Sequence, residues 1–404
     1  MTDAWDQAAR PAVPRTVWAL GLVSLLMDLS SEIVHGLLPL FLTVSLGASV
    51  AMVGLIDGLG EATASITKVF SGYLSDRSGK RKPLILLGYG LGAASKPLFA
   101  LAGSPWLVFG ARFADRFGKG LRGAPRDALV ADVTPQAIRG RAFGLRQALD
   151  TVGAFAGPLL AIGLMAALAD DIRAVFWIAV IPGALAVLVV VFGVGEPASA
   201  PADSPARAPL RPGDLKHMGR PFWRIVMLGT VFTLARFSEA FLVLKASAAG
   251  LPLTLAPLVL VAMNLVYAAG AYPSGVAADR IAPRRLLAGG IACLMAADLV
   301  LALTTGLIGA FAGIALWGLH MALTQGLLAK LVVDSAPSEL RGSAFGLFNL
   351  ATGIALFLAS LSAGLLWDLM GMAATFYAGA GFATLAFLLV GLHPPGKSEH
   401  LRAT

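Results

Sequence analysis

Ionisable side chains recur inside apolar stretches of this sequence, where they could carry protons or bind charged solutes. Asp28, Glu32 and His35 follow one another at intervals of four and three residues. In a helix this spacing places all three side chains on one face. An acid beside a base can hold a proton in one state and form an ion pair in another. We therefore predict that this stretch belongs to a proton- or substrate-binding site.

Further charges lie in other apolar stretches, most densely between residues 112 and 127. A charge at the centre of a bilayer costs at least about 2.5 kcal/mol. We therefore expect these groups to pair with one another or to line a wet cavity. The predicted substrate- and proton-binding residues are Asp28, Glu32, His35, Asp57, Glu61, Arg112, Arg116, Lys119, Arg122, Arg236 and Glu239.

Plainer interpretations of these charges stay open. An isolated pair such as Arg236 and Glu239 can be a buried ion pair that only orients helices. His320 is interpreted as a packed or hydrogen-bonded histidine and not as a proton carrier. The chain has five His, one Cys and no H-x-x-x-H spacing, so neither a metal site nor a cofactor is expected.

The composition shows what kind of scaffold must position these residues. Of 404 residues, 57% are hydrophobic and 13% are charged, whereas soluble domains have about 25% charged residues. Apolar segments recur that are long enough to cross a hydrocarbon layer of about 30 Å. Twelve are predicted, at 16–45, 50–72, 83–103, 106–130, 143–168, 173–194, 223–247, 253–275, 285–304, 308–332, 344–367 and 373–393. The sequence indicates an all-α polytopic membrane protein with twelve transmembrane helices.

Basic residues sort by loop and indicate the topology. Most of the 31 Lys and Arg residues fall in the two tails and in alternate loops. Because such loops stay on the cytoplasmic side, we expect a multi-pass plasma (inner) membrane protein with both termini cytoplasmic. This placement explains the net charge of +8 without a nucleic-acid partner. The N-terminus lacks a cleavable signal pattern, and the single Cys293 allows no intrachain disulfide.

The chain contains an internal repeat of half its length. "DVTPQAIRGRAFGL" at 132–145 aligns with "DSAPSELRGSAFGL" at 334–347, and Asp76 aligns with Asp279 at nearly the same offset. Such a repeat predicts two pseudo-symmetric six-helix halves in parallel orientation. We assign residues 1–194 to the first half, 195–222 to a Pro- and Ala-rich cytoplasmic linker, and 223–404 to the second half.

Three motifs carry a resemblance to the major facilitator superfamily. The family's loop signature, Gly-x-x-x-Asp-Arg-x-Gly-Arg-Lys, is matched by Gly72, Asp76, Arg77, Gly79, Lys80 and Arg81. A second copy keeps Gly275, Asp279 and Arg280. The helix 5 antiporter motif is matched by Gly144, Gly153, Gly157 and Pro158, with Ala161 and Ile162 in place of its closing Gly-Gly. In helix 4, Arg116, Lys119 and Gly120 approximate the Arg-x-x-Gln-Gly pattern.

The resemblance implies a central cavity lined by helices 1, 4, 7 and 10. We interpret the loop signature as a cytoplasmic gate that makes contacts in one conformation and breaks them in another. Topology anchoring is the plainer interpretation, but it needs no acid and does not explain the paired Asp76 and Asp279.

Together these features predict a secondary active transporter of a small organic solute, because no nucleotide-binding loop is present. The helix 5 resemblance favours proton-coupled export. The alternatives are a proton-coupled importer of an organic anion or metal chelate, and a non-transporting membrane sensor or assembly factor with the same fold. No enzyme is expected, and the resemblance implies that a monomer embedded in the bilayer suffices.

Two hypotheses follow for the mechanism. Glu32 is the expected proton carrier, paired with Arg116 or Lys119, and a repeated Ser-Glu places Glu239 at a comparable depth in helix 7. The bases of helix 4 predict a positively charged cavity and a substrate with acid groups. The alternative is that Asp28, Glu32, Asp57 and Glu61 neutralise most of those bases internally.

Overall fold

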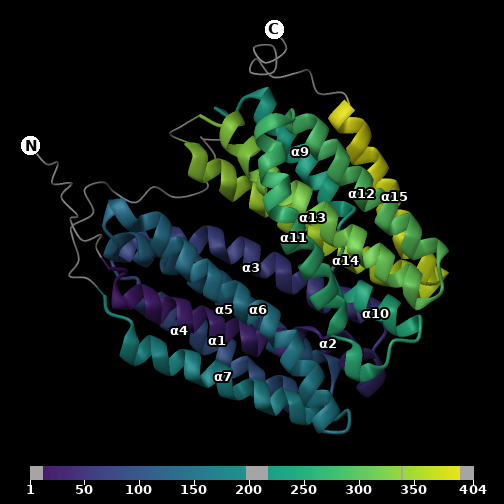
Figure 1. The fold of residues 1–404 in the computed structure, drawn as a ribbon, viewed down its shortest axis with the longest axis horizontal. Coiled ribbons are helices and arrows are strands. Elements are labelled where there is room, and N and C mark those ends of the chain that lie inside the picture. The colour runs from purple at the N-terminus through teal and green to yellow at the C-terminus, as the bar shows by residue number, and fades with distance from the viewer. Residues whose placement is uncertain (1–11, 197–216, 338–339, 392–404) are drawn as a thin grey trace, which may run out of the picture.

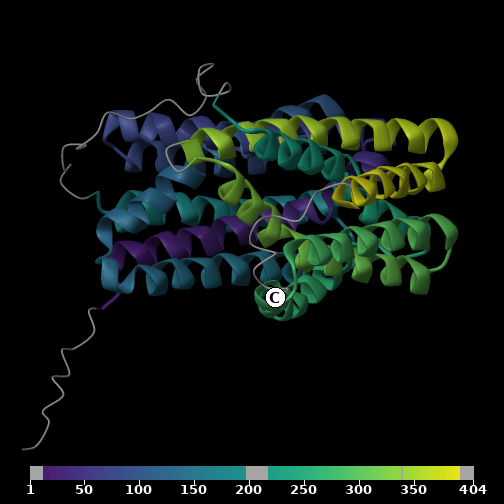
Figure 2. The same ribbon diagram turned by 90° about the horizontal axis from the view of Figure 1, so that it is seen from above.

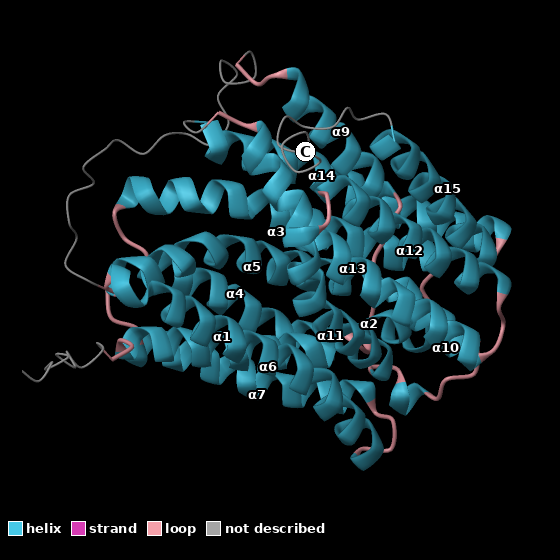
Figure 3. Cartoon of the chain, turned by 45° about the horizontal axis from the view of Figure 1, so that its top comes forward, coloured by secondary structure: helices cyan, strands magenta, loops and turns pink. Residues whose placement is uncertain are grey.

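A computed structural model describes residues 12–196, 217–337 and 340–391, apart from a few side chains within helices, Asp279 and Arg280 among them. Every regular element in these ranges is a helix, and loops join them (Figure 3). The long helices are α1 (Arg15–His35), α3 (Val50–Ser78), α4 (Lys82–Leu101), α5 (Pro105–Val133), α6 (Arg139–Ala167), α7 (Ile172–Gly193), α9 (Arg220–Leu234), α11 (Leu258–Arg280), α12 (Pro283–Leu303), α13 (Leu307–Ser335), α14 (Arg341–Met370) and α15 (Met372–Gly391). The short elements are α2 (Leu38–Leu40), η1 (Phe41–Ser45), η2 (Gln136–Ile138), α10 (Ala240–Ala248) and η3 (Leu253–Leu255).

These helices confirm the predicted all-α polytopic fold. Ten segments of the described residues are long and apolar enough to cross a membrane. Helix α5 is also 29 residues long, but its charges keep it below that threshold. The seventh predicted crossing is divided between α9 and α10, which have 15 and nine residues. Helix α5 and this divided crossing, added to the ten segments, give the twelve predicted crossings.

The helices form two groups that lie side by side (Figure 1). In the first, called here the N-terminal half, α1 packs against α6 and α7, and α5 packs against α3 and α4. In the second, the C-terminal half, α12 packs against α13 and α15. Figure 2 shows the helices of each half running roughly parallel to one another. The predicted boundaries at 194 and 222 stay predictions, because residues 197–216 of the linker lie outside the described residues.

The two halves meet most extensively where α3 crosses α14. Glycines allow the close approach, since a methyl group built at Gly54 would lie 2.1 Å from the carbonyl oxygen of Ser360. One at Gly364 would lie 2.6 Å from the Cα of Ala51. Such distances are shorter than van der Waals contact. Larger residues at these positions would therefore hold the two helices apart.

Polar contacts close the same end of the molecule. The carboxylate of Asp368 accepts hydrogen bonds from the backbone amides of Val50 and Ala51, at 3.1 and 2.8 Å. These amides begin α3, where backbone donors lack intrahelical partners and the helix dipole is positive. Thr254 donates to Asp170 across the halves, at 2.6 Å. We call this region, formed by residues 46–57, 168–171, 249–257 and 360–371, the sealed end.

Two predicted segments are interrupted helices, which differs from the sequence-based expectation. In the predicted crossing 16–45, α1 ends at His35 and the chain continues through α2 and the π-helical η1. Pro39 contributes here because it has no amide hydrogen to donate. In the predicted crossing 223–247, residues 235–239 separate α9 from α10. The amide of Ser238 bonds to the Ser360 hydroxyl at 3.1 Å, and the Ser238 hydroxyl bonds to Asp57 at 2.6 Å. Polar contacts to α14 and α3 thus replace helical ones.

Candidate functional site

A cavity of about 580 Å³ lies between the two halves. Eight of the twelve predicted crossings contribute to its lining, including the four that the resemblance implied. Its residues are Glu32 and His35 of α1, Glu61 and Ser65 of α3, Arg116 and Lys119 of α5, Ala154 of α6, Thr233 of α9, Arg236 to Glu239 of the break, Asn264 of α11, Trp317 and Leu328 of α13, and Phe345, Phe348, Asn349, Thr352, Gly353 and Leu356 of α14. The cavity thus collects both charged and aromatic groups.

Asp57 is the most highly connected acid near the cavity. Its carboxylate lies 2.7 Å from Nη2 of Arg112, an ion pair by distance although its angles are not those of a hydrogen bond. The same carboxylate accepts the hydroxyl hydrogen of Ser238 from the other half, at 2.6 Å. Both Asp57 and Arg112 are almost fully buried. Their pairing keeps two charges from being buried alone, which would be costly.

A second set of ion pairs runs along α5. Glu61 lies 3.1 Å from Nη2 of Arg116 and 3.6 Å from Nη2 of Arg112. Behind them, Asp115 receives a hydrogen bond of 2.8 Å from Lys96 of α4. These contacts compensate the charges of Arg112 and Arg116 within the N-terminal half. They involve Asp57 and Glu61, two of the four acids in the alternative in which acids neutralise the bases internally.

Glu32 and His35 form the contact that their spacing predicts. Nδ1 of His35 lies 3.4 Å from a carboxylate oxygen of Glu32, and its Nε2 lies 4.0 Å from Asp57. Glu32 is held in place by α6, since a methyl group built at Gly157 would lie 2.6 Å from its Cβ. The helix 5 motif thus sets the distance between α1 and α6 at this depth.

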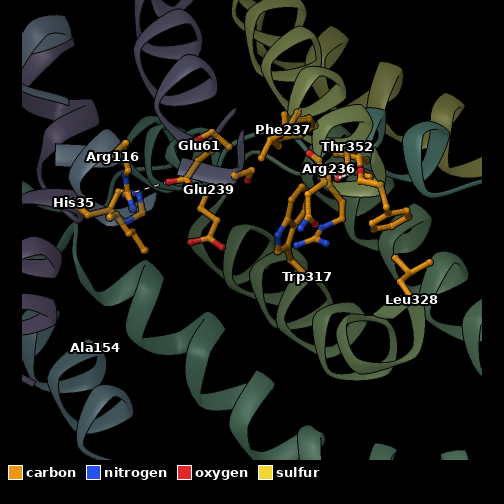
Figure 4. A pocket seen from close by; sticks show the side chains of 18 of the residues that line it. His35, Glu61, Arg116, Ala154, Arg236, Phe237, Glu239, Trp317, Leu328 and Thr352 are labelled. Carbon is orange, nitrogen blue, oxygen red and sulfur yellow. Dashed lines mark hydrogen bonds and ion pairs between the residues drawn. The ribbon is translucent and has the colours of Figure 1, made fainter. Parts of the chain in front are cut away.

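Three lining charges differ from the rest. Among the described residues, Lys119, Arg236 and Glu239 have no oppositely charged group within 4.0 Å. Figure 4 shows Glu239 between the His35–Arg116 side and Arg236. The guanidinium of Arg236 instead lies 5.7 Å from the ring centre of Phe232. The helix break at 235–239 separates Arg236 from Glu239, so the buried pair considered from their spacing does not form.

Four of the predicted site residues, Asp28, Asp57, Arg112 and Arg122, do not line the cavity. Arg112 is buried behind it, and Arg122 lies 4.5 Å from the ring centre of Tyr89. Asp28 interacts electrostatically with Asp150, Lys119 and Arg122. Of the four predicted bases of α5, Arg116 and Lys119 line the cavity and Arg112 and Arg122 do not.

A separate charged network lies nearer the start of α6. Arg126 pairs with Asp127 at 3.1 Å and with Asp150 at 3.7 Å. Arg146 approaches the same two acids at 3.9 and 3.6 Å. Because its charges are balanced two to two, this network fits the interpretation of buried pairs that orient helices.

The aromatic and amide wall of the C-terminal half was not predicted from the sequence. Phe237, Trp317, Phe345 and Phe348 line the cavity together with Asn264 and Asn349. Nothing in the apolar pattern separates a ring that faces a cavity from one that faces lipid. The internal repeat was the one available signal, because it places α13 and α14 opposite the charged helices of the first half.

Asp298 and His320 are fully buried ionisable side chains of the C-terminal half. Both carboxylate oxygens of Asp298 and both ring nitrogens of His320 lack a hydrogen-bond partner among the described residues. His320 packs against Trp317 with ring centres 5.3 Å apart. This agrees with its interpretation as a packed histidine. Neither residue lines the cavity.

The loop signature organises the end of α3 away from the sealed end. Gly79 has a φ of +64°, a conformation that favours glycine, and it ends the helix. Arg81 bonds to Asp76 and lies 3.3 Å from Asp132. Burial lowers the pKa of Arg81, but the hydrogen bond and charge of Asp76 together with Asp132 raise it above its ordinary value. Arg77 contacts Tyr73 within the helix at 3.4 Å.

The remaining motif residues have simpler surroundings. Gly72 faces Ala124 of α5, Gly153 packs against Leu25 of α1, and Pro158 is buried inside α6. Gly144 and Gly275 have open space where a Cβ would stand. The side chains of Asp279 and Arg280 lie outside the described residues. The gate role of the two loop motifs, Lys80 included, stays a prediction.

The described residues contain no cluster of three or more His, Cys, Asp or Glu side chains that could hold a metal ion. The arrangement can instead bind a solute by ion pairs, hydrogen bonds and aromatic contacts. It can also hold a proton on a carboxylate that faces the cavity.

Comparison with known proteins places this fold and cavity in one family. The model of the Major Facilitator Superfamily matches residues 20–360 and 240–404. An uncharacterized MFS-type transporter of Methanocaldococcus jannaschii is 31% identical over 389 residues, which cover 93% of this chain and 94% of the relative. The multidrug resistance protein MdtH of Yersinia enterocolitica is 34% identical over 137 residues, which cover 34% of each chain.

Solved structures show the same architecture. A bacterial homologue of the human lysosomal transporter Spinster, in an inward-facing and occupied conformation, superposes with a TM-score of 0.73 at 16% identity. The match covers 93% of this chain and 95% of that one. Members of this superfamily are multi-pass membrane proteins that transport small molecules, and they are not enzymes. With its helices, its cavity and its sequence matches taken together, the chain belongs to the major facilitator superfamily.

Proposed function

We propose that this protein is a proton-coupled secondary transporter that exports a small organic solute across the plasma membrane by alternating access. The cavity carries this proposal. It lies between two halves that contact each other at the sealed end, and its lining combines paired charges, unpaired charges and aromatic rings. A solute site that is shut on one side of the membrane is the arrangement that alternating access requires.

The side on which the cavity opens follows from charge placement. The loops and adjoining helix ends opposite the sealed end hold Lys80, Arg81, Arg139 and Arg284. Basic loops favour the cytoplasm, so this conformation faces inward and both termini are cytoplasmic. Among the described residues, the hydrogen bonds of Asp368, Asp170 and Asp57 to the other half all involve the sealed end, which supports this orientation. One copy of the chain supplies the whole lining, which supports a functional monomer.

Glu239 is the strongest candidate for the proton carrier. Glu32 already has His35 at 3.4 Å, whereas Glu239 has no cation within 4.0 Å among the described residues. Across the halves Glu239 interacts with His35, which favours its charged form, and with Glu32 and Glu61, whose negative charges repel it. Protonation removes these interactions, so the charge on Glu239 changes how favourably the two halves approach. The position of Glu239 in a helix break allows it to move as the halves rearrange.

The direction of transport rests on two observations. The helix 5 residues that resemble the antiporter motif pack against α1 directly beneath Glu32. The partial match to a multidrug resistance protein also supports export. Proton-coupled import of an organic anion or metal chelate is the second candidate, because Lys119 and Arg236 are unpaired cations that face the cavity.

Proteoliposomes that enclose a pH-sensitive dye test the proposal. Cationic drugs, organic acids, sugar phosphates and ferric chelates are added outside, and the internal pH is recorded. A solute that enters in exchange for protons raises the internal pH, whereas one that enters with protons lowers it. An increase supports the exchange on which export depends, and a decrease supports the importer. Uptake of a radiolabelled solute without any pH change would exclude proton coupling, and no uptake of any solute would favour the non-transporting sensor.

A further inference from the structure

The paired and unpaired charges of the cavity fall into a definite pattern. On the wall of the N-terminal half, Glu32 has His35 and Glu61 has Arg116 as partners. Lys119 on the same wall is exposed and has no partner within 4.0 Å among the described residues. Carboxylates on this wall are thus already paired, while an ammonium group is available. An incoming acid group would find a partner here, but an incoming amine would have to displace one.

Helix contacts fix the depth of Lys119 in the cavity. The neighbouring Gly120 packs against Ala64 and Thr67 of α3, where a methyl group would lie 2.6 Å from the carbonyl oxygen of Ala64. Ala62 and Ser65 of α3 in turn face Gly353 of α14. Because these helices lie against one another, Lys119 is level with the turn of α14 that precedes Gly353. That turn carries Phe348 and Asn349.

The opposite wall at this depth contains a firmly held aromatic ring beside the amide of Asn349. The ring of Phe348 fits against Gly229 of α9, where a methyl group would lie 2.4 Å from ring atom Cε2. Phe345 and Leu328 continue the same wall toward the end opposite the sealed end. Figure 4 shows Leu328 on the far side of the cavity from His35 and Arg116. A fixed ring offers a flat apolar surface at little entropic cost.

We propose that the cavity binds an amphipathic organic anion, with its acid group at Lys119 and its aromatic or alkyl body against Phe348 and Phe345. The proposal rests on the transport function proposed above and names its substrate class. The cavity volume of about 580 Å³ lies in the range of sites for drug-sized molecules, about 300–1,000 Å³. A monoanion of that size satisfies the unpaired ammonium and covers the apolar wall. Glu239 stays free to carry the proton.

Three fluorescent probes with one aromatic body test the class directly. Dansylglycine is an anion, dansylamide is neutral and dansylcadaverine is a cation at neutral pH. Binding to the purified full-length protein in detergent is measured by energy transfer from tryptophan to the dansyl group. We expect dansylglycine to bind about tenfold more tightly than dansylcadaverine, as one charge-assisted hydrogen bond provides.

Two variants test which residue binds the acid group of the probe and which binds its aromatic body. Lys119→Gln is expected to weaken dansylglycine about tenfold while leaving dansylamide within about twofold. Lys68→Gln is the matched control, because Lys68 is an exposed lysine of α3 that does not line the cavity. Phe348→Ala should weaken both of these probes. The proposal is overturned if the cation binds as tightly as the anion, if Lys119→Gln leaves dansylglycine affinity unchanged, or if no probe binds.

The outcomes separate this inference from the proposed function. Binding in detergent requires no transport. If a cationic solute drives proton exchange in proteoliposomes while dansylglycine does not bind, the substrate class is wrong and the transporter stands. If dansylglycine binds as expected but no solute is ever transported, the site stands and the transport function is wrong.

Discussion

Asp57 is a single side chain that serves two structural purposes. It compensates the charge of Arg112 within the N-terminal half and accepts a hydrogen bond from Ser238 of the C-terminal half. Charge compensation and closure of the sealed end therefore depend on the same carboxylate. The spacing of Asp57 and Glu61 predicted a functional acid here. It did not predict a contact between the halves, because Ser238 lies 181 residues away in the sequence.

Replacement of Asp57 by Asn is expected to destabilise the protein. The change removes the closer of the two acids of Arg112 and leaves only Glu61 at 3.6 Å, which also pairs with Arg116. Removing one partner of a buried pair typically costs about 3–5 kcal/mol. The thermal unfolding midpoint in detergent should fall clearly below that of the wild type. Asp298→Asn is the matched control, because Asp298 is equally buried but has no ion-pair partner among the described residues. Similar midpoints for the two variants would contradict the role assigned to Asp57.

Proton coupling is a second property that depends on single residues. Glu239→Gln should retain exchange of substrate across liposomes but lose its acceleration by a pH gradient, because a glutamine cannot release a proton. Glu32→Gln is the comparison, since His35 lies 3.4 Å from that carboxylate. We expect the Glu239 variant to lose more of the gradient effect than the Glu32 variant. The opposite order would return the role of proton carrier to Glu32.

The crossing of α3 and α14 determines at the level of elements which end of the molecule is closed. Gly54 and Gly364 let the two backbones touch, and Asp368 caps the beginning of α3. Helix contacts of this kind were implied by the 46 glycines of the sequence. Their positions were not, because a glycine that faces a helix and one that faces lipid look alike in an apolar segment.

Gly54→Ala is expected to open the sealed end. Its methyl group would lie 2.1 Å from the Ser360 carbonyl oxygen, so α3 and α14 must separate. Spin labels at Val44 and Leu369, which are both exposed near this end, should report a longer distance in a background without Cys293. Gly163→Ala is the control, because a Cβ at Gly163 would meet only open space. An unchanged distance in Gly54→Ala would show that the glycine contact does not determine closure.

The break between α9 and α10 shows why helix ends were harder to predict than helices. Residues 223–247 satisfy the length and hydropathy of one crossing. The interruption arises from hydrogen bonds of Ser238 to Asp57 and Ser360, which are distant in sequence. Propensity within the segment cannot indicate such contacts, because partners on other helices supply them. The break also places Arg236 and Glu239 apart, which their spacing of three did not suggest.

At the scale of the whole molecule, the sequence predicted the twelve crossings, the two-half repeat and the family. Hydropathy and repeats depend on many residues at once, so these predictions do not rely on any one contact. The site was predicted only on its charged wall. Its aromatic wall depends on which faces of α13 and α14 turn inward, and that is decided by packing between helices.

The loop signature offers a test of the conformational cycle. In this conformation Asp76 bonds to Arg81 within its own half, and over half of its side chain is exposed. Asp76→Asn should therefore leave the thermal stability of this conformation nearly unchanged. Transport should nevertheless fall severely if the carboxylate secures the gate in the opposite conformation. Full transport by the variant, measured in proteoliposomes, would leave topology anchoring as its role.

The ion pairs of α5 also bear on how the chain is made. This helix is not apolar enough to be among the ten candidate spans. Its partners Asp57, Glu61 and Lys96 belong to α3 and α4, which leave the ribosome before it. A polar helix whose counter-charges are already in the bilayer can insert together with the helices that carry them, whereas alone it would bring unpaired charges into lipid.

In a glycosylation-mapping assay, α5 fused alone to a reporter should fail to insert, and α3–α4–α5 together should insert. Biosynthesis of this protein would then depend on the order of its helices as much as on their hydropathy.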